Sequence, residues 1–192
     1  MAEAVRVVKR GGVVAVPTDT VYGLGCDPSS DEAVGRLFEA KNRQAKPVPL
    51  LCADLGVAER LVDLNEVARN LAGSHWPGAL TIVAPIKGQG KLSRLLDQGS
   101  GYLGVRVPDS EVCVAIAGRV GGSLTGTSAN LSGQPSCRTA AQVVASLDGR
   151  VQLVIDGGEL RGKESTVVKV FGGTVEVLRK GSVRIQEGEL ET

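Results

Sequence analysis

Hydroxyl groups and a carboxylate follow the first apolar run of the chain. Residues Val13 to Val16 are typical of a short strand buried on both faces, which Pro17 should end because proline offers no N–H to a ladder. The next residues bring three hydroxyls and one carboxylate to the end of that strand: Thr18, Asp19, Thr20 and Tyr22. Ligands of α/β proteins bind beyond the carboxyl ends of strands, so this segment is a candidate binding loop. A strand followed by an ordinary polar turn is the simpler alternative.

A second hydroxyl-rich turn ends the segment 123–130, which is predicted to start as a strand. Residues 125–133 read TGTSANLSG, and their Ser, Thr and Asn side chains together with turn amides can hold an anion or an adenine and ribose. An ordinary turn has the same composition, because Ser, Asn and Gly all favour turns for local reasons.

Three cations in six residues predict a local anion site. Lys41, Arg43 and Lys46 follow a predicted helix, and both guanidinium and ammonium groups bind phosphate or carboxylate. A solvated basic helix end is the alternative. Arg106 lies inside the apolar run VRVP, where an arginine needs a ligand or a structural acid such as Asp109.

Composition limits the classes of function. The 192 residues are 42% hydrophobic and 22% charged with a net charge of +1, so the chain as a whole has no basic footprint for nucleic acid. Aromatic residues make up only 3%, too few for base-stacking platforms. The sequence contains no P-loop and no GxGxxG motif. An enzyme of this composition should work by positioning and electrostatics, and the single His75 reads as a packing or capping residue.

Cysteine usage and the first ten residues bear on the compartment. The four cysteines are far apart and form no C-x-x-C pair, which is typical of free thiols in a reducing cytoplasm. Residues Met1 to Arg10 carry helical charge spacing and no signal-peptide pattern, and no apolar run approaches the ~20 residues of a membrane span. We therefore expect a cytoplasmic protein with no membrane partner.

The periodicity predicts one mixed α/β domain over residues 1–192, with a core at about 5–181 and a loose tail at 182–192. Helices are expected at Ala2–Lys9, from a capping box at Ser29 to Ala40, in two short segments near 57–62 and 66–73, after Ser110, from a capping box at Thr139, and as a patch within 87–98. Strands are expected at 13–16, 47–52, 78–85, 102–108 and 151–155, and segment 123–130 should start as a strand and end as a turn. A final hairpin of 165–170 and 174–178 is expected across Gly172 and Gly173.

Seven short motifs in order give the chain a resemblance to a known family. PTDTVYGLGCD, KNR before a proline-led strand, WPGALTIV, GVRVPD, TSANLSG, EST and LRKG span residues 11–181 and resemble the YrdC/TsaC threonylcarbamoyl-AMP synthases in their single-domain form. The resemblance implies a twisted, open mixed sheet with flanking helices and a concave electropositive face. It also implies synthesis of threonylcarbamoyl-AMP and pyrophosphate from L-threonine, bicarbonate and ATP, with Mg²⁺ held largely by the ATP phosphates. The product serves tRNA modification, so tRNA and downstream threonylcarbamoyl-transferase proteins become expected partners.

The resemblance also assigns residues. It implies catalytic roles for the Lys-x-Arg and Ser-x-Asn pairs: Lys41, Arg43, Ser128 and Asn130. It implies ATP contacts at Arg43, Lys46, Tyr102, Ser128, Ser136 and Arg179, and threonine contacts at Thr20, Arg106, Gly126 and Ser165, with no protein metal ligand. The chain departs from the family at Gln44, where proline is common, in a basic loop one residue shorter, and near Leu51, where some relatives carry a histidine.

Three alternatives remain open at this point. One is a non-catalytic module of the same fold that binds double-stranded RNA or tRNA. Another is a sister branch that shares the fold but lacks the intact Ser-x-Asn pair, against which Asn130 argues. The last is transfer of a carbamoyl group from carbamoyl phosphate by the same sites.

Overall fold

The strands divide between two sheets. The structure is a computed structural model that describes residues 1–42, 46–88 and 91–186. A six-stranded sheet has the order β10-β9-β4-β5-β3-β6, and a four-stranded sheet has the order β7-β2-β1-β8. Both sheets mix parallel and antiparallel pairs, for example β4 parallel to β9 and antiparallel to β5. Mixed α/β structure was predicted, whereas the division into two sheets was not.

The strands lie on the predicted apolar runs, and most of them are shorter than predicted, whereas β9 and β10 each end one residue later. The six-stranded sheet contains β3 (Leu50–Cys52), β4 (Leu80–Pro85), β5 (Tyr102–Arg106), β6 (Ser123–Thr125), β9 (Thr166–Phe171) and β10 (Thr174–Arg179). The four-stranded sheet contains β1 (Val14–Val16), β2 (Gly23–Gly25), β7 (Thr127–Ser128) and β8 (Leu153–Val154). The predicted final hairpin is confirmed as β9 and β10, with Gly172 in its turn at φ +56°.

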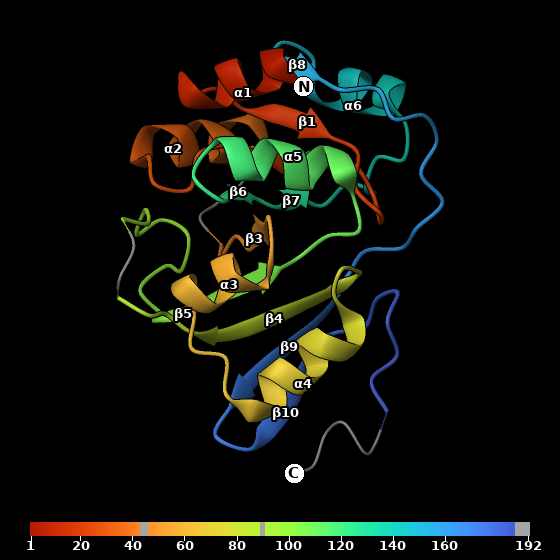
Figure 1. The fold of residues 1–192 in the computed structure, drawn as a ribbon. Helices are drawn as coiled ribbons and strands as arrows, with labels where there is room; N and C mark the ends of the chain where they lie inside the picture. Colours follow the sequence, from red (N-terminus) through yellow and green to blue (C-terminus); the bar gives the residue numbers. More distant parts are fainter. Residues whose placement is uncertain (43–45, 89–90, 187–192) are drawn as a thin grey trace.

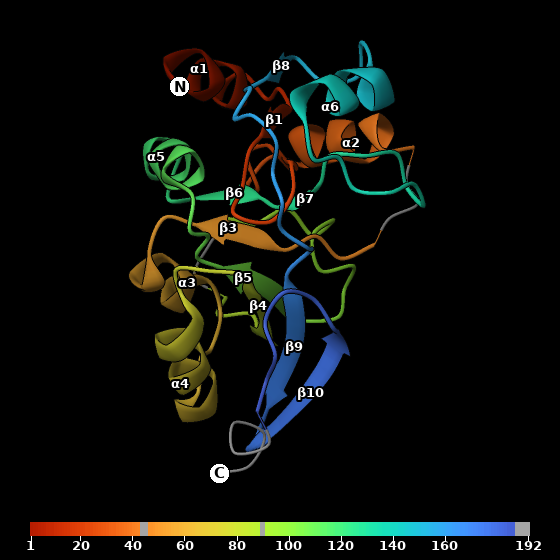
Figure 2. The ribbon, with the colours of Figure 1, turned by 90° about the vertical axis from the view of Figure 1, so that its right-hand side faces the viewer.

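Helices cover both sheets (Figure 1). They are α1 (Ala2–Lys9), α2 (Asp31–Ala40), α3 (Leu55–Leu61), α4 (Glu66–His75), α5 (Glu111–Arg119) and α6 (Ala140–Leu147). In Figure 1, α1, α2 and α6 gather around the four-stranded sheet, whereas α5 packs against β3 and β6, α3 against β3 and α4 against β4. Figure 2 shows the same separation from the side, with α3 and α4 on one side of the six-stranded sheet. Among the described residues, no helix is long and apolar enough to cross a membrane.

Gly126 lies where the two sheets meet. The residue separates β6, which pairs with β3, from β7, which pairs with β2, so one nearly continuous segment serves both sheets. Its N–H donates to the Pro49 carbonyl at 2.8 Å, and a Cβ at this position would lie 2.6 Å from Leu51 Cγ. Only glycine fits so close an approach, and the chain changes sheet at that point.

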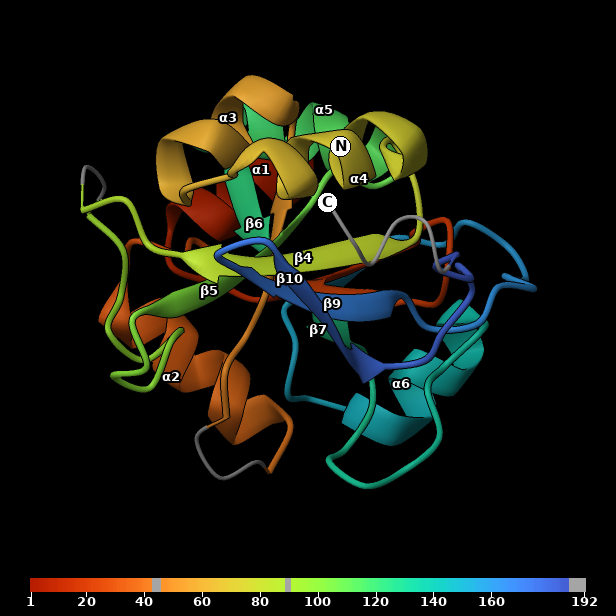
Figure 3. The ribbon, with the colours of Figure 1, turned by 90° about the horizontal axis from the view of Figure 1, so that it is seen from below.

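The six-stranded sheet uses its two faces differently. On β9, Val168 and Val170 are buried in a core that includes Leu71 of α4. Side chains alternate across a strand, so the residues between them point to the other face. Figure 3 shows this opposite face turned away from α3 and α4. Each fully buried Val, Leu or Ile contributes about 1.5–3 kcal/mol, so the helix-covered face supplies much of the stability and leaves the other face available for ligands.

Three sequence expectations require correction. The N-cap of α2 is Ser30, whose side chain accepts from the Ala33 N–H, whereas Ser29 donates to Asp27 in the preceding turn. The helical patch within 87–98 is a series of turns where it is described. The glycine-rich turn after β1 contains strand β2, which sequence propensity hides because glycine is a poor strand former.

The last described residues are attached to the body of the chain. The Val183 N–H donates to Thr166 Oγ1, and the Ser182 hydroxyl donates to the Lys163 carbonyl. The remainder of the tail predicted to be loose, 187–192, lies outside the described residues.

Candidate active site

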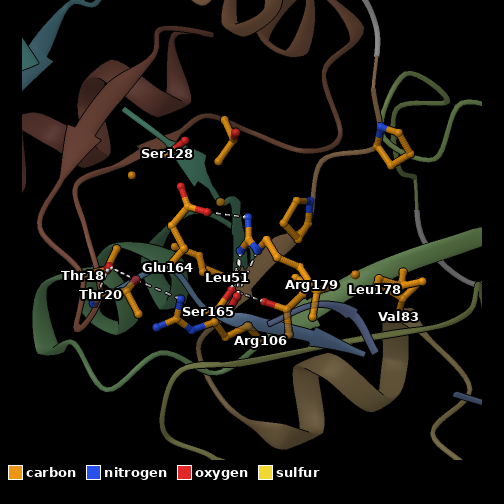
Figure 4. Close-up of a pocket in the computed structure, with 18 of the residues that line it drawn as sticks. Thr18, Thr20, Leu51, Val83, Arg106, Ser128, Glu164, Ser165, Leu178 and Arg179 are labelled. Carbon is orange, nitrogen blue, oxygen red and sulfur yellow. Dashed lines mark hydrogen bonds and ion pairs between the residues drawn. The ribbon is translucent and has the colours of Figure 1, made fainter. Parts of the chain in front are cut away.

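A cavity of about 650 Å³ lies between the two sheets. The six-stranded sheet supplies one wall through β4, β5, β9 and β10, and the loop after β1 together with β7 supplies the other (Figure 4). Its volume is within the range of about 300–1,000 Å³ typical of ligand sites. The cavity therefore lies beyond the carboxyl end of β1, where the sequence predicted a binding loop.

Strand alternation brings the cavity side chains to one face. On β4 the lining residues are Thr81 and Val83, and on β9 they are Val167 and Lys169. On β10 the ladder shifts register between Val177 and Arg179, which is a bulge. Without it, Arg179 would point away from Glu176 and Leu178, whereas all three line the cavity.

Arg106 on β5 forms a buried corner with the loop after β1. Its guanidinium donates to the Gly78 carbonyl at 2.8 Å and to Thr20 Oγ1 at 3.2 Å, and forms an ion pair with Asp19. The two charged side chains are 6% and 15% exposed, so solvent screens the pair weakly. The acid that pairs with Arg106 is therefore Asp19, not Asp109. Two of the five guanidinium hydrogens remain for an anion, by count of the donors.

Ser165 lies between the two cavity arginines in Figure 4. Its hydroxyl is 2.9 Å from Thr81 Oγ1, and it also accepts from Arg179 at 3.1 Å. Arg179 donates twice more to the Ser165 carbonyl and forms an ion pair with Glu164 at 3.0 Å. The orientations of the hydroxyl and the guanidinium are thus fixed together.

Lys41 lies behind the second hydroxyl-rich turn. It follows α2, is 2% exposed, and donates from Nζ to the carbonyls of Ser128 and Asn130 and to the Asn130 amide oxygen. Asn130 in turn donates to the Leu131 and Gln134 carbonyls. The Lys-x-Arg and Ser-x-Asn motifs are therefore in direct contact through Lys41, which holds the turn that presents Ser128 to the cavity.

The structure places most of the predicted site residues in or beside the cavity. The cavity brings together seven of them from segments far apart in the chain: Thr20, Tyr102, Arg106, Gly126, Ser128, Ser165 and Arg179. Three others adjoin it or lie elsewhere: Lys41 and Asn130 are buried behind the turn, and Lys46 is exposed and does not line the cavity. Ser136 lines a second cavity, beside α6, and reaches the first through a hydrogen bond to Glu164. Arg43 lies outside the described residues.

Sequence reasoning missed three charged residues of the cavity, which are Lys169, Glu164 and Glu176. Lys169 places its Nζ 4.1 Å from the centre of the Tyr102 ring, a cation–π contact. Glu164 forms the Arg179 ion pair. Lys169 could have been predicted, because a lysine between valines in TVVKVF indicates the solvent-facing side of a half-buried strand. Glu164 precedes the strand, and nothing local distinguishes it from a solvated acid.

The thiols are unsuited to nucleophilic chemistry. All four cysteines are free and buried. Desolvation raises the pKa of Cys26 and Cys52 to about 12 and that of Cys113 to about 11, so these groups stay protonated near neutral pH. The described residues contain no group of three or more His, Cys, Asp or Glu side chains placed to hold a metal ion. The polar side chains that the cavity does offer a ligand are cations, hydroxyls and carboxylates.

Comparisons with known proteins converge on one family. The sequence model of Sua5/YciO/YrdC, described as "Telomere recombination", matches residues 6–181. The chain is 36% identical over 192 residues to a threonylcarbamoyl-AMP synthase of Bacillus subtilis, covering 98% of this chain and 55% of that protein. A threonylcarbamoyl-AMP synthase of Enterobacter sp. is 38% identical over 172 residues, covering 85% of this chain and 88% of that one. The chain thus spans about half the length of the Bacillus relative and most of the Enterobacter relative.

Solved structures have the same arrangement of elements. Pyrococcus abyssi Sua5 complexed with L-threonine superposes with a TM-score of 0.88 at 36% identity, covering 93% of this chain and 53% of that one. Escherichia coli YciO superposes with a TM-score of 0.84 at 28% identity, covering 93% and 87%. The YrdC-like mixed α/β fold expected from the sequence is confirmed.

Proposed function

Because the chain belongs to the Sua5/YciO/YrdC family, we propose that it is an L-threonylcarbamoyladenylate synthase that converts L-threonine, bicarbonate and ATP to threonylcarbamoyl-AMP and pyrophosphate. One observation carries the proposal. The cavity holds all four residues expected to contact threonine and also Tyr102, Ser128 and Arg179, expected to contact ATP. The two substrates can therefore meet in one cavity, and the similar fold of the threonine-bound Pyrococcus protein supports this assignment.

The Arg106 corner is the proposed threonine site. A carboxylate pairs with the remaining guanidinium hydrogens, and weak solvent screening strengthens that pair. The hydroxyls of Thr20 and Ser165 accept or donate hydrogen bonds to the amino acid, and both are already oriented by Arg106 and Thr81. This arrangement leaves the amino group to face the centre of the cavity.

The chemistry then needs two steps in the same space. The amine nitrogen attacks the carbon of bicarbonate and water is lost, which gives the carbamate. A carbamate oxygen then attacks the α-phosphorus of ATP, and pyrophosphate leaves. Cations of the cavity stabilise the charge that grows on the leaving pyrophosphate, as in other phosphoryl-centre reactions. Arg179 lines the cavity and is assigned this role. We assign it also to Arg43 and to Lys46, which directly precedes the cavity residue Pro47.

Mg²⁺ is part of the proposal. The cavity fits a magnesium–phosphate complex that brings most of its own ligands, because Arg179 and Ser128 can meet phosphate oxygens while phosphate and water supply the coordination that Mg²⁺ prefers. When bound, the ion would neutralise phosphate charge. Lys41 is assigned as a positioning residue that holds the Ser128 turn. The adenylate is an activated acyl donor, so we place the protein upstream of transferases that modify tRNA. The free cysteines favour a cytoplasmic location.

The decisive experiment is an incubation with ATP, Mg²⁺, bicarbonate and L-threonine, read by mass spectrometry and a pyrophosphate assay. We expect an adenylate whose formation requires both threonine and bicarbonate. Substitution of Arg43→Ala should reduce turnover by at least tenfold, and Lys9→Ala, on the exposed face of α1, should not. RNA binding with a steep salt dependence and no adduct would favour the RNA module. Turnover of carbamoyl phosphate in place of bicarbonate and threonine would favour the carbamoyl-transfer alternative.

A further inference from the structure

Both arginines of the cavity are paired with a carboxylate of the protein itself. Arg106 pairs with Asp19 and Arg179 pairs with Glu164. The first pair is 6% and 15% exposed, whereas the second is 47% and 41% exposed. Removing a partner from a buried ion pair leaves a charge uncompensated, but an exposed pair is weak and exchanges readily. The Arg106–Asp19 pair is therefore a fixed structural contact, whereas the Arg179–Glu164 pair can open and exchange.

Glu164 connects three segments at the cavity wall. One carboxylate oxygen accepts from the Ser136 hydroxyl at 2.5 Å, and the other pairs with Arg179 NH1 at 3.0 Å. Arg179 is meanwhile anchored by its Nε and NH2 groups to Ser165. The NH1 edge is the part of the guanidinium that meets an anion, and in this structure that anion is Glu164.

We propose that the Glu164 carboxylate occupies the place of a substrate phosphate and must be displaced from Arg179 and Ser136 when the nucleotide binds. The inference rests on the proposed function, because it takes the ligand to be a nucleotide polyphosphate. Glu164 thereby sets the affinity of the cavity for polyphosphate. The same competition favours release of pyrophosphate, since the carboxylate returns to Arg179 when the product leaves.

The contacts allow this exchange without damage to the cavity. Arg179 keeps its three hydrogen bonds to Ser165 when Glu164 leaves, so the guanidinium stays oriented for the phosphate. A polyphosphate carries more charge than one carboxylate and also repels Glu164 at close range. Because Glu164 is 41% exposed, its side chain can rotate into solvent instead of remaining buried and unpaired.

The test compares the wild type with Glu164→Gln, which keeps the shape and hydrogen-bonding capacity of the side chain but removes its charge. The control is Glu176→Gln, which removes one negative charge from β10 in the same cavity. Isothermal titration with inorganic pyrophosphate and with ATP·Mg²⁺ gives the affinities, and steady-state kinetics separate KM for ATP from kcat. Thermal unfolding of each variant shows that it is folded.

We expect Glu164→Gln to bind pyrophosphate and ATP about threefold to tenfold more tightly and to show a lower KM for ATP. The gain is modest because the Glu164 carboxylate that competes for Arg179 in the wild type is partly screened by solvent. Its kcat should fall, because pyrophosphate leaves more slowly. The Glu176→Gln control should change these affinities less than twofold.

Other outcomes separate this inference from the proposed function. If the wild type forms the adenylate but Glu164→Gln binds pyrophosphate equally or more weakly, Glu164 only positions Arg179 and the inference is wrong. Equal gains in both variants would also overturn it, because the effect would then be general charge. Tighter binding by Glu164→Gln without adenylate formation in the wild type supports the inference and contradicts the synthase function. Failure of both proteins to bind any polyphosphate overturns both.

Discussion

Arg106 shows how one residue can serve structure and ligand binding together. The guanidinium of this buried residue contacts the Gly78 carbonyl, Thr20 and Asp19. A buried arginine with these partners fixes the loop after β1 against β5. The geometry that holds the loop is therefore the same geometry that prepares the proposed threonine site.

Truncation of Arg106 should cost stability as well as binding. Arg106→Ala leaves Asp19 buried without its cation, so we expect the free energy of unfolding to fall by about 3 kcal/mol in urea titrations. Adding Asp19→Asn should recover part of that loss. The exposed Arg6–Glu3 pair gives the control, where Arg6→Ala should cost less than about 0.5 kcal/mol. Equal costs at Arg106 and Arg6 would contradict a buried structural pair.

The buried thiols predict a loss of stability in alkali. Their pKa values rise from 9.0 to about 12 for Cys26 and Cys52 and to about 11 for Cys113. In the unfolded chain these thiols ionise above pH 9, whereas in the folded chain they remain protonated, so the unfolded state is favoured as pH rises. From pH 8.5 to 10 the free energy of unfolding should drop by about 3–4 kcal/mol from these three groups.

Urea unfolding at the two pH values measures this drop, and Cys52→Ala should reduce it by about one third. A pH dependence unchanged in Cys52→Ala would show that other groups, Tyr22 among them, cause the loss. The pKa of Tyr22 is also raised, mainly by burial, so its contribution has the same sign.

At the scale of elements, Gly126 decides how the two sheets join. A Cβ there would lie 2.6 Å from Leu51 Cγ and 2.9 Å from its Cδ2. We expect Gly126→Ala to lower the free energy of unfolding by about 1–3 kcal/mol through overpacking and to weaken threonine binding, because the residue lines the cavity. Urea unfolding and calorimetry measure the two effects.

The same substitution at Gly35 should have the opposite sign. Gly35 lies inside α2, and nothing lies within 4 Å of a Cβ built there. Gly35→Ala should therefore raise the free energy of unfolding by about 0.5–1 kcal/mol. If Gly126→Ala and Gly35→Ala were both neutral, the junction of the two sheets would tolerate a side chain, and the close approach of Gly126 to Leu51 would not contribute to stability.

The sequence predicted those elements whose signals are local. Helix α1 was predicted with its observed bounds, because its apolar and charged residues repeat at helical spacing. The β9–β10 hairpin was predicted from alternation around Gly172. Strands β7 and β8 have two residues each, too few to show a period, so their assignment to a separate sheet depends on pairing partners far away in the chain. Strand β2 was missed for a related reason, because its two glycines carry no strand signal.

The site was predictable in residue type but not in pairing. Arg106 stood out as an arginine among apolar neighbours, yet its partner Asp19 lies 87 positions away, and no local rule links them. The bulge that turns Arg179 into the cavity depends on how β10 pairs with β9, which the sequence of β10 alone does not state. Glu164 was missed because its role comes from the two segments that converge on it.

At the scale of the whole molecule, the cavity lies between the two sheets and takes its lining from both of them. Arg106, Ser165 and Arg179 come from the six-stranded sheet or its margin, and Thr20 and Ser128 come from the opposite wall. A ligand that contacts both walls adds contacts between parts of the chain that already share hydrophobic clusters and the bonds of Arg106 to Thr20 and Asp19. Binding should therefore stabilise the folded chain as one unit.

Thermal unfolding tests this linkage. With ATP·Mg²⁺ or L-threonine at about 100 times its dissociation constant, each ligand should add about 2.7 kcal/mol, which raises Tm by about 5–11 °C for a chain of this size. Arg179→Ala should abolish the shift with ATP but keep that with threonine, and Arg106→Ala should do the reverse, apart from its lower starting Tm. A Tm shift with ATP that survives in Arg179→Ala would place the nucleotide away from Arg179. Loss of the ATP shift in Arg106→Ala as well would show that the two arginines do not divide the substrates between them. Separate losses in the two variants would instead show that the two arginines, from neighbouring parts of one wall, divide the cavity between the substrates.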